Sequence, residues 1–226
     1  MNLAQTFNQG LVYPTIPSVS PIVFVVDDDL SVRESLELLI RSEGWQPETF
    51  QEAGGFLTRP RPLVPSCLIL DLALPDLSGL ELQEMIAQER AEMPIIFISG
   101  CGDIPTTVRA MKAGAVDFLV KPFGSDVLLR AIREGLNRSR VALDRAVELE
   151  SLRNCYRSLT HRERQVMALV VSGLLNKQVG AELGISEITV KAHRGQVMRK
   201  MKADSLADLV RMAASLRPSR QTMHLA

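Results

Sequence analysis

The chain has 226 residues, of which 46% are hydrophobic and 4% aromatic, with 26 basic and 26 acidic side chains. This length fits one large domain or two small ones, and the apolar fraction is sufficient for packed cores, which excludes wholesale disorder. The 3 cysteines stand in unrelated contexts that suit neither a disulfide framework nor a CxxC metal site, so they favour a reducing compartment. With no run of 18 apolar residues and no basic-then-apolar start, we expect a cytoplasmic protein without a membrane segment.

The charged side chains are distributed unevenly along the chain. Residues 1–140 carry a net charge of −6 and residues 159–226 carry +6, whereas residues 141–158 are balanced. An acidic module joined to a basic one indicates two separate tasks, and the basic module is a candidate for nucleic-acid binding. Charge alone leaves open whether the basic surface is only a solvated face.

Short apolar runs that begin at residue 22 alternate with helical patterns. Strands are expected at 22–26, 46–50, 67–70, 95–98 and 116–120, and helices at 31–42, 52–58, 79–89, 104–113 and 125–139. This alternation predicts an α/β fold: a doubly wound, parallel five-stranded sheet covered on both faces. Such sheets carry their working residues just beyond the C-terminal ends of the strands. Residues 1–21 lack this rhythm and are predicted to form a disordered tail.

Polar side chains follow four of the expected strands. They are Asp27, Asp28 and Asp29 after the first strand, Asp71 after the third, Ser99 after the fourth and Lys121 after the fifth. Carboxylates gathered at one sheet edge require a cation, which Lys121 supplies in part and Mg²⁺ can complete together with phosphate oxygens. The pattern therefore predicts phosphoryl chemistry with Asp71 as nucleophile and Ser99 as a hydrogen-bond donor to the phosphoryl group. For any one of these aspartates taken alone, a helix N-cap is the alternative.

The strings VFVVDDD, LILDLALPDLSGLEL, PIIFISG and AMKAGAVDFLVKPF carry a recognisable family pattern. Through them, residues 22–140 resemble the flavodoxin-like receiver domain of bacterial two-component response regulators. The resemblance implies that Asp71 is the phosphoacceptor and that Mg²⁺ (or Mn²⁺) is held at Asp27, Asp28, Asp71 and the carbonyl of Ala73. It also implies that Ser99 and Phe118 form a switch pair, that Lys121 contacts the phosphoryl group, and that the bond from Lys121 to Pro122 is cis.

Two positions depart from the family in an informative way. Response regulators tune hydrolysis of the phospho-aspartate with the residues two beyond the phosphoacceptor and two beyond the switch hydroxyl. Here these residues are Ala73 and Cys101. Neither orients a water molecule as an acid or an amide would, so we expect slow self-dephosphorylation.

The basic end of the chain has an all-helical pattern. Residues 125–158 contain no proline and predict one helical segment, of which 141–158 would be a linker; its two apolar stripes leave open a plain linker or a signalling helix. Further helices are expected at 161–172, 176–183, 187–202 and 205–216. Thr160 and Glu163 have capping-box spacing, and Asn176 and Ser186 are predicted N-caps. The helices 176–183 and 187–202 predict a helix-turn-helix, with a plain helical bundle as the alternative.

The string LTHRERQVMALVVSGLLNKQVGAELGISEITVKAHRGQVMRKM resembles the DNA-binding domain of the LuxR/FixJ/NarL type. This resemblance assigns residues 159–217 to a helix-turn-helix DNA-binding domain, followed by a tail at 218–226. It places Lys191, Ala192 and Gly195 toward the bases, and Lys177, Thr189, His193 and Arg194 at backbone or nearby contacts. Because Ala192 is small and Gly195 has no side chain, direct recognition of the bases would depend on Lys191, Arg194 and Arg199. For His193 a purely structural role is the alternative.

Together the two resemblances predict a FixJ-type response regulator rather than an enzyme. A histidine kinase would phosphorylate Asp71, receivers would dimerise through the face of residues 104–113 and 116–120, and the dimer would bind double-stranded DNA. RNA polymerase is a further expected partner, since transcription would usually be activated. A haloacid-dehalogenase-type phosphatase is the enzymatic alternative, but its second aspartate is replaced by Ala73. A phosphorylation-independent regulator is the other alternative.

Overall fold

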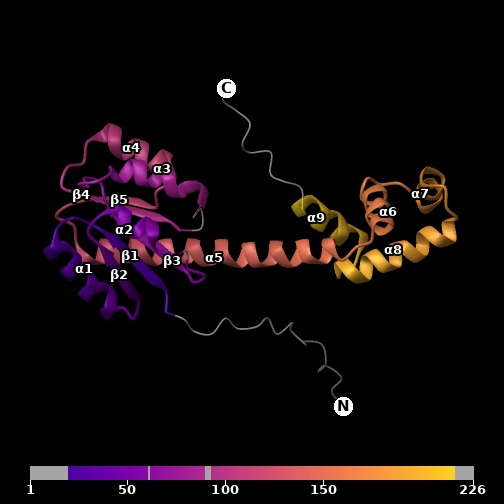
Figure 1. Cartoon of the computed structure of the whole chain (residues 1–226), viewed down its shortest axis with the longest axis horizontal. Helices are drawn as coiled ribbons and strands as arrows, with labels where there is room; N and C mark the ends of the chain where they lie inside the picture. The colour runs from indigo at the N-terminus through magenta and orange to yellow at the C-terminus, as the bar shows by residue number, and fades with distance from the viewer. Residues whose placement is uncertain (1–19, 61, 90–92, 217–226) are drawn as a thin grey trace, which may run out of the picture. The chain divides into compact units, whose positions relative to one another are not determined.

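The computed structural model describes residues 20–60, 62–89 and 93–216. The two expected tails, 1–21 and 218–226, therefore lie outside the described residues apart from residues 20 and 21. The chain divides into two compact units, Met1–Leu143 and Asp144–Ala226, whose elements can be followed in Figure 1. Within the described ranges no helix combines the length and the apolar character that crossing a membrane requires.

The first unit is built around one parallel sheet. Its strands are β1 (Ile22–Val26), β2 (Gln46–Phe50), β3 (Ser66–Asp71), β4 (Ile95–Ser99) and β5 (Asp117–Val120), in the order β2-β1-β3-β4-β5. The helices that follow them are α1 (Leu30–Ser42), α2 (Ala53–Thr58), α3 (Gly79–Glu89), α4 (Ile104–Lys112) and α5 (Ser125–Arg157). This topology confirms the predicted doubly wound fold.

Alternating side chains of the strands form two separate cores, one on each face of the sheet. On β1, Phe24 and Val26 pack into a core with apolar residues of α2, α3 and α4. Val23 and Val25 point to the opposite face and pack with residues of α1 and α5. Because both faces are covered, β1, β3 and β4 are buried along their whole length and nearly all apolar, which explains why their sequences lack the alternation of a half-exposed sheet, whereas the edge strand β2 (QPETF) is only partly buried.

The register of the strands brings their polar ends together. Val26 of β1 pairs with Leu70 of β3, so the residues that follow, Asp27 and Asp71, leave adjacent central strands at the same level. Next in the sheet, Asp71 pairs with Ile98, which directly precedes Ser99. The polar edge inferred from the sequence is therefore present in the fold.

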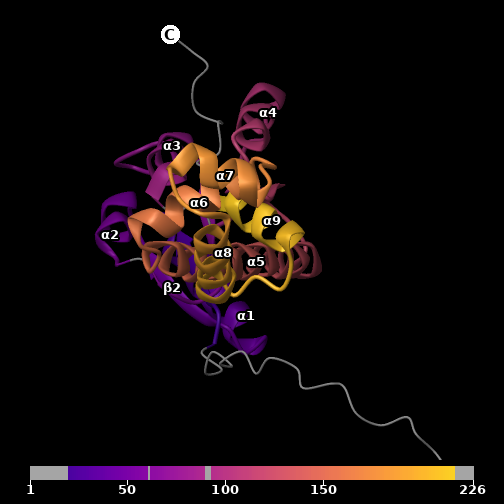
Figure 2. The same ribbon diagram turned by 90° about the vertical axis from the view of Figure 1, so that its right-hand side faces the viewer.

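In the second unit, four short helices follow α5 within the described residues, up to residue 216. They are α6 (His161–Val171), α7 (Asn176–Leu183), α8 (Glu187–Met201) and α9 (Leu206–Leu216). α8 packs against α6 and α7, and α9 packs against α6 (Figure 2). The predicted capping box is confirmed, since the Thr160 side chain caps the backbone N–H of Glu163 and Glu163 accepts a hydrogen bond from the N–H of Thr160 at 2.8 Å. The sequence boundaries of α5 through α9 agree with the expected ones to within one or two residues.

One predicted helix cap is wrong. α7 begins at Asn176 rather than after it, and Leu175 occupies the N-cap position. The side chain of Gln178 caps this end of the helix instead, since its Oε1 accepts a hydrogen bond from the Leu175 N–H at 2.8 Å. The side-chain oxygen of Asn176 instead accepts a hydrogen bond from Arg194 of α8 at 3.2 Å. Ser186 does cap α8, accepting from the Thr189 N–H at 3.1 Å as predicted.

Candidate functional site

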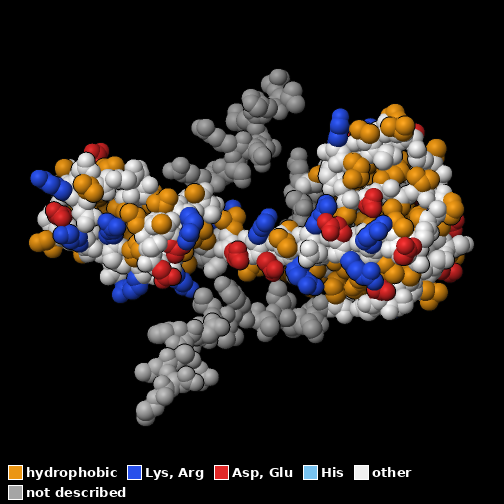
Figure 3. All heavy atoms as spheres, turned by 180° about the vertical axis from the view of Figure 1, so that it is seen from behind, with side chains coloured by type: hydrophobic (Ala, Val, Ile, Leu, Met, Phe, Trp, Pro, Cys, Tyr) orange, Lys and Arg blue, Asp and Glu red, His pale blue; other side chains and the backbone are white. Residues whose placement is uncertain are grey.

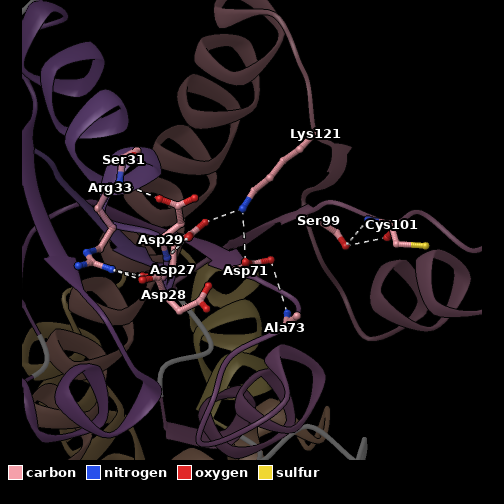
Figure 4. Close-up of polar contacts among 10 residues, drawn as sticks. All are labelled: Asp27, Asp28, Asp29, Ser31, Arg33, Asp71, Ala73, Ser99, Cys101 and Lys121. Atoms are coloured by element: carbon pink, nitrogen blue, oxygen red, sulfur yellow. Dashed lines mark hydrogen bonds and ion pairs between the residues drawn. The ribbon is translucent and has the colours of Figure 1, made fainter.

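Three carboxylates converge at the C-terminal edge of the sheet. One oxygen from each of Asp27, Asp28 and Asp71 lies within 4.8 Å of the others. Figure 4 shows the three side chains close together. Asp27 is fully buried and Asp71 is 7% exposed, whereas Asp28 is open to solvent. A set of only oxygen donors, partly accessible to water, fits a hard divalent cation that keeps several water ligands. The three predicted acidic residues are therefore brought together as the sequence indicated.

Lys121 is the cation that the structure itself supplies to this cluster. Its Nζ lies 2.7 Å from Oδ2 of Asp27 and 3.3 Å from Oδ2 of Asp71. Burial would lower the pKa of Lys121, but hydrogen bonds and attraction from the two carboxylates outweigh it, so the pKa lies above its usual value. The ammonium group thus stays charged between the two buried acids. Its bond to Pro122 is cis, as the family resemblance implies.

The pKa of Asp71 is raised above its ordinary value. Burial is the main cause and repulsion from Asp27 adds to it, while attraction to Lys121 acts in the opposite direction. The backbone N–H of Ala73 lies 3.5 Å from Oδ1 of Asp71 and further offsets the shift. The surroundings of Asp71 therefore disfavour its charged form, and a second cation beside the carboxylate would stabilise that form.

Two further residues support the cluster although the sequence did not single them out. Arg33 of α1 donates hydrogen bonds to the backbone carbonyls of Asp27 at 2.7 Å and Asp28 at 2.9 Å, which fixes the loop after β1. Gly79 starts α3, and a Cβ placed there would lie 2.5 Å from the backbone oxygen of Asp71. An arginine four residues after the aspartate run could have indicated the role of Arg33, whereas nothing in the sequence indicates the close approach at Gly79.

The third aspartate of the run has a different task. The Asp29 side chain caps α1 by accepting a hydrogen bond from the Ser31 N–H at 2.8 Å, and in Figure 4 it turns away from Asp71 toward Ser31. The alternative interpretation, a helix N-cap, therefore applies to Asp29 and not to Asp27 or Asp28.

Ser99 and Phe118, the two residues of the expected switch pair, make their contacts outside the carboxylate cluster. Ser99 donates its hydroxyl hydrogen to the carbonyl oxygen of Cys101 at 2.6 Å. Phe118 of β5 is half-buried, and its ring centroid lies 6.1 Å from that of Phe97. In this arrangement Asp71 accepts its hydrogen bonds from Lys121 and Ala73, and neither Ser99 nor Phe118 contributes one.

The second unit contains the helix-turn-helix geometry. α7 ends at Leu183 and is capped by Gly184, whose φ of 64° lies in the left-handed region that glycine adopts without strain. A Cβ at Gly180 would lie 2.7 Å from the carbonyl oxygen of Ile185, so glycine there allows the turn to fold tightly back onto α7. Two residues later Ser186 caps α8. The short turn thus fixes α8 against α7, as recognition helices require.

The buried and exposed faces of α8 agree with the helical pattern of the sequence. Val190, Val197 and Met201 are buried in the cores of the unit. The exposed members of the predicted DNA-contact set are Lys191, Ala192, Gly195 and Arg199 on α8 and Lys177 on α7. In Figure 3, Lys and Arg side chains are interspersed with hydrophobic ones on the visible face of this unit.

Other residues of that set are engaged inside the unit. Arg194 is half-buried and donates to Asn176 at 3.2 Å, which joins α8 to α7. The Thr189 hydroxyl lies 2.8 Å from that of Ser186. His193 is half-buried as well. The structure therefore divides the predicted contacts into exposed side chains and side chains that also stabilise the helix-turn-helix.

Comparison with known proteins agrees with both halves of this description. Residues 23–133 match the response regulator receiver domain, and residues 157–213 match the luxR family of bacterial regulatory proteins. The chain is thus a two-component response regulator with a receiver domain and a LuxR-type DNA-binding domain, a family of transcription regulators rather than of catalytic enzymes.

Within this family the chain is similar to particular regulators over most of its length. It is 51% identical to nodulation protein W of Bradyrhizobium diazoefficiens, over 89% of each chain. It is 42% identical to the transcriptional regulatory protein FixJ of Azorhizobium caulinodans, over 84% of this chain and 90% of that protein. The solved structure of the response regulator StyR, 48% identical, covers 87% of this chain and 99% of its own with a TM-score of 0.76. The chain belongs to the FixJ-type response regulators.

Proposed function

We propose that this protein is a transcription regulator switched by phosphorylation of Asp71. The observation that carries the proposal is the convergence of Asp27, Asp28 and Asp71, whose oxygens lie within 4.8 Å of one another, with the ammonium group of Lys121 bonded to two of them, Asp27 and Asp71. The phosphodonor would be a histidine kinase, and the chain would act in the cytoplasm, where a bacterial chromosome lies. In this proposal residues 22–140 accept the phosphoryl group, 141–158 link, and 159–217 bind DNA.

The chemistry proposed at Asp71 is a phosphoryl transfer without a separate catalytic base. An oxygen of the Asp71 carboxylate attacks phosphorus while the bond from phosphorus to the imidazole nitrogen of the kinase breaks, and that nitrogen leaves with the electron pair. Because Asp71 acts as a carboxylate, no proton has to be removed from it. Lys121, 3.3 Å from Oδ2 of Asp71, is placed to neutralise charge on the transferred oxygens.

Mg²⁺ (or Mn²⁺) fits the same residues. Asp27, Asp28 and Asp71 would hold it together with the carbonyl of Ala73, and when bound it would neutralise charge on the phosphoryl oxygens. Support comes from the all-oxygen donor set and from the raised pKa of Asp71, which burial causes.

The response to phosphorylation is proposed to run through Ser99 and Phe118. A phosphoryl oxygen would compete with the Cys101 carbonyl for the Ser99 hydroxyl, whose present hydrogen bond measures 2.6 Å. Phe118, packed on Phe97, would move inward as Ser99 moves. The face of α4 and β5 would then pair with that of a second chain, which requires only a few kcal/mol of differential stabilisation.

DNA binding is proposed for the helix-turn-helix, with α8 in the major groove of double-stranded DNA. Exposed Lys191 and Arg199 would reach base edges, with Ala192 and Gly195 facing the groove floor. Lys177, Thr189, His193 and Arg194 would contact or orient toward the backbone. Receiver dimers would place two such units on paired half-sites and recruit RNA polymerase, so that transcription rises.

The phosphorylation step is tested by incubating the full chain with acetyl phosphate and Mg²⁺ and separating the product on a gel that retards phosphoproteins. The wild-type chain and Asp76→Asn, which changes a neighbouring acid outside the cluster, should be retarded, and Asp71→Asn should not. If Asp71→Asn is retarded like the wild type, Asp71 is not the phosphoacceptor.

The DNA-binding step is tested on duplexes selected from a random pool by the phosphorylated chain. Phosphorylation should tighten binding of the wild type at fixed salt and leave Asp71→Asn unaffected. Equal binding by both proteins, with and without acetyl phosphate, would contradict phosphorylation control and favour the phosphorylation-independent regulator.

A further inference from the structure

The exposed face of α8 is apolar at its centre. Ile188, in the first turn of the helix, is 81% exposed, which makes it nearly as accessible as an isoleucine in an extended chain. Ala192, one helical turn later, and Gly195, a further turn on, are also exposed. Among the described residues, the neighbouring residues and the nearby backbone of the helix apart, no atom lies within 4 Å of the position of a Cβ at Gly195. These three residues, separated by four and three positions, form one stripe along α8, here called the apolar stripe.

Cationic side chains border the apolar stripe, one at its side and one at its C-terminal end. Lys191 is exposed and forms an ion pair with Glu187 at 3.0 Å, and Arg199 follows one turn after Gly195. The only polar groups that the stripe itself presents are those of the backbone. The opposite side of the helix is in the core, where Val190 and Val197 are at most 1% exposed. The position of Ile188 is therefore not explained by packing within the described part of the unit.

We propose that Ile188, with Ala192 beside it, recognises the 5-methyl group of a thymine in each half-site. This inference depends on the proposed insertion of α8 into the major groove, where residues near the N-terminus of a recognition helix contact base edges. Thymine is the base that presents a methyl group there, and an aliphatic side chain recognises it by apolar contact.

The chemistry of the side chain excludes the other base edges. Ile188 offers no hydrogen-bond donor or acceptor, so placing it against the edge of guanine, adenine or cytosine would remove water from a polar group without replacing the hydrogen bond. The absence of a side chain at Gly195 permits the helix to approach the groove floor closely, which brings the short Ala192 and the first turn into reach. Specificity at this position then comes from apolar contact, while Lys191 contributes charge and hydrogen bonding.

The test removes the apolar group from one side of the contact at a time: the 5-methyl group from the DNA, or the aliphatic side chain of Ile188 from the protein. Duplexes selected by the phosphorylated full-length chain are resynthesised with 2′-deoxyuridine at one thymine at a time, which deletes only the 5-methyl group. For one thymine in each half-site, the substitution should weaken wild-type binding about fourfold per half-site, corresponding to one buried methyl-sized group. Ile188→Ser should lose affinity for the thymine duplex by a similar factor and should bind the deoxyuridine duplex no more weakly than the thymine one.

Two variants serve as controls. Ile188→Val keeps branched methyl groups and should retain the preference for thymine. Leu38→Ala removes a side chain that is 71% exposed on α1 and should leave both affinities unchanged. Because Ile188 is exposed, the Ile188→Ser protein should unfold at the wild-type temperature, which separates a lost contact from a lost fold.

The outcomes distinguish this inference from the function on which it depends. If the wild type binds selected duplexes but every deoxyuridine substitution costs Ile188→Ser as much as the wild type, the double-mutant cycle shows no coupling and the assignment of Ile188 is wrong. If the phosphorylated wild type selects no duplex, both the DNA-binding proposal and the inference fail.

Discussion

The Ser99 hydroxyl donates a hydrogen bond to the carbonyl oxygen of Cys101 at 2.6 Å, and its oxygen accepts one from the Cys101 N–H at 3.2 Å. Both groups belong to the loop that follows β4, so the hydroxyl is held in its own loop while Asp71 is bonded to Lys121 and Ala73. A phosphoryl group on Asp71 would bring a charged acceptor into competition with the Cys101 carbonyl. Hydrogen bonds to charged groups are stronger than those to neutral ones, which favours the exchange.

Substitution of Ser99 should therefore separate phosphorylation from its consequence. Ser99→Ala should still accept phosphate at Asp71, because the alanine removes none of the acidic residues or Lys121. It should lose about tenfold in the affinity gain for DNA on phosphorylation, since one hydrogen bond to a charged oxygen contributes about 1.5 kcal/mol. Phosphoprotein gels and DNA titrations measure the two steps separately.

Ser99→Thr is the control for this change, because it keeps the hydroxyl and should keep the affinity gain. A Ser99→Ala protein whose DNA affinity rises on phosphorylation as much as that of the wild type would contradict the role given to the hydroxyl.

Mg²⁺ should stabilise the receiver unit through Asp28 and not through Asp29. At ten times its dissociation constant, a ligand that binds only the folded state adds about 1.4 kcal/mol to the free energy of unfolding. Asp28→Asn removes one of the three converging carboxylates and should abolish most of that gain. Asp29→Asn removes a charge of the same run but keeps an N-cap side chain for α1, so it should respond to Mg²⁺ like the wild type.

Thermal unfolding of the full chain with and without Mg²⁺ measures this difference. Equal stabilisation of Asp28→Asn and Asp29→Asn would show that the ion does not use the cluster. Chelation of Mg²⁺ should also prevent phosphorylation by acetyl phosphate in the wild type.

The sequence sufficed for those features that depend on the course of the backbone. Apolar runs predicted four of the strands and their spacing the fifth, at 46–50, and parallel strands then required Asp27 and Asp71 to meet at one edge. Side-chain hydrogen bonds depend on neighbours that are distant in sequence, and here the predictions were weaker. Asn176 had the local signature of an N-cap, but Arg194, 18 residues away, competes for its side-chain oxygen. The orientation of Ser99 toward Cys101 and the contacts of Arg33 likewise follow from the folded arrangement of loops.

Asp76 links the loop after β3 to α2. Its carboxylate accepts hydrogen bonds from the backbone N–H groups of Ala53 at 3.3 Å and Gly54 at 3.0 Å, at the N-terminus of α2. Partial desolvation would raise the pKa of Asp76, but these hydrogen bonds together hold it below its usual value. Asp76→Ala should therefore destabilise the receiver unit by about 1 kcal/mol, the usual cost of losing a helix cap.

Asp76→Asn retains an oxygen that can accept from the same N–H groups and should recover most of the loss. Calorimetry of the full chain checks both variants, and only the transition of the receiver unit should move. A shift of the same size in Asp76→Asn and Asp76→Ala would instead assign the stabilisation to the charge.

Glu163 and Lys200 join the start of α6 to the end of α8. The Glu163 side chain is 6% exposed, and its Oε2 lies 2.7 Å from Nζ of Lys200. The hydrogen bond from Lys200 is the main cause that lowers the pKa of Glu163, and the N–H of Thr160 adds to the effect. Glu163→Gln keeps an acceptor for Thr160 but loses the ion pair, so it should destabilise the helical unit by about 1–2 kcal/mol at pH 7.

This loss should depend on pH in a defined direction. Because the pKa of Glu163 is lower in the folded state than in the unfolded state, its charge stabilises the fold fully above the unfolded value, about 4.3, and less as pH falls through the folded value. The difference in unfolding free energy between wild type and Glu163→Gln should therefore be constant from pH 7 to about pH 5 and shrink below it. Thr160→Ala removes a neutral cap, so its cost should remain the same over that range. A Glu163→Gln difference that persists undiminished below pH 3 would show that the carboxylate charge is not what stabilises this contact.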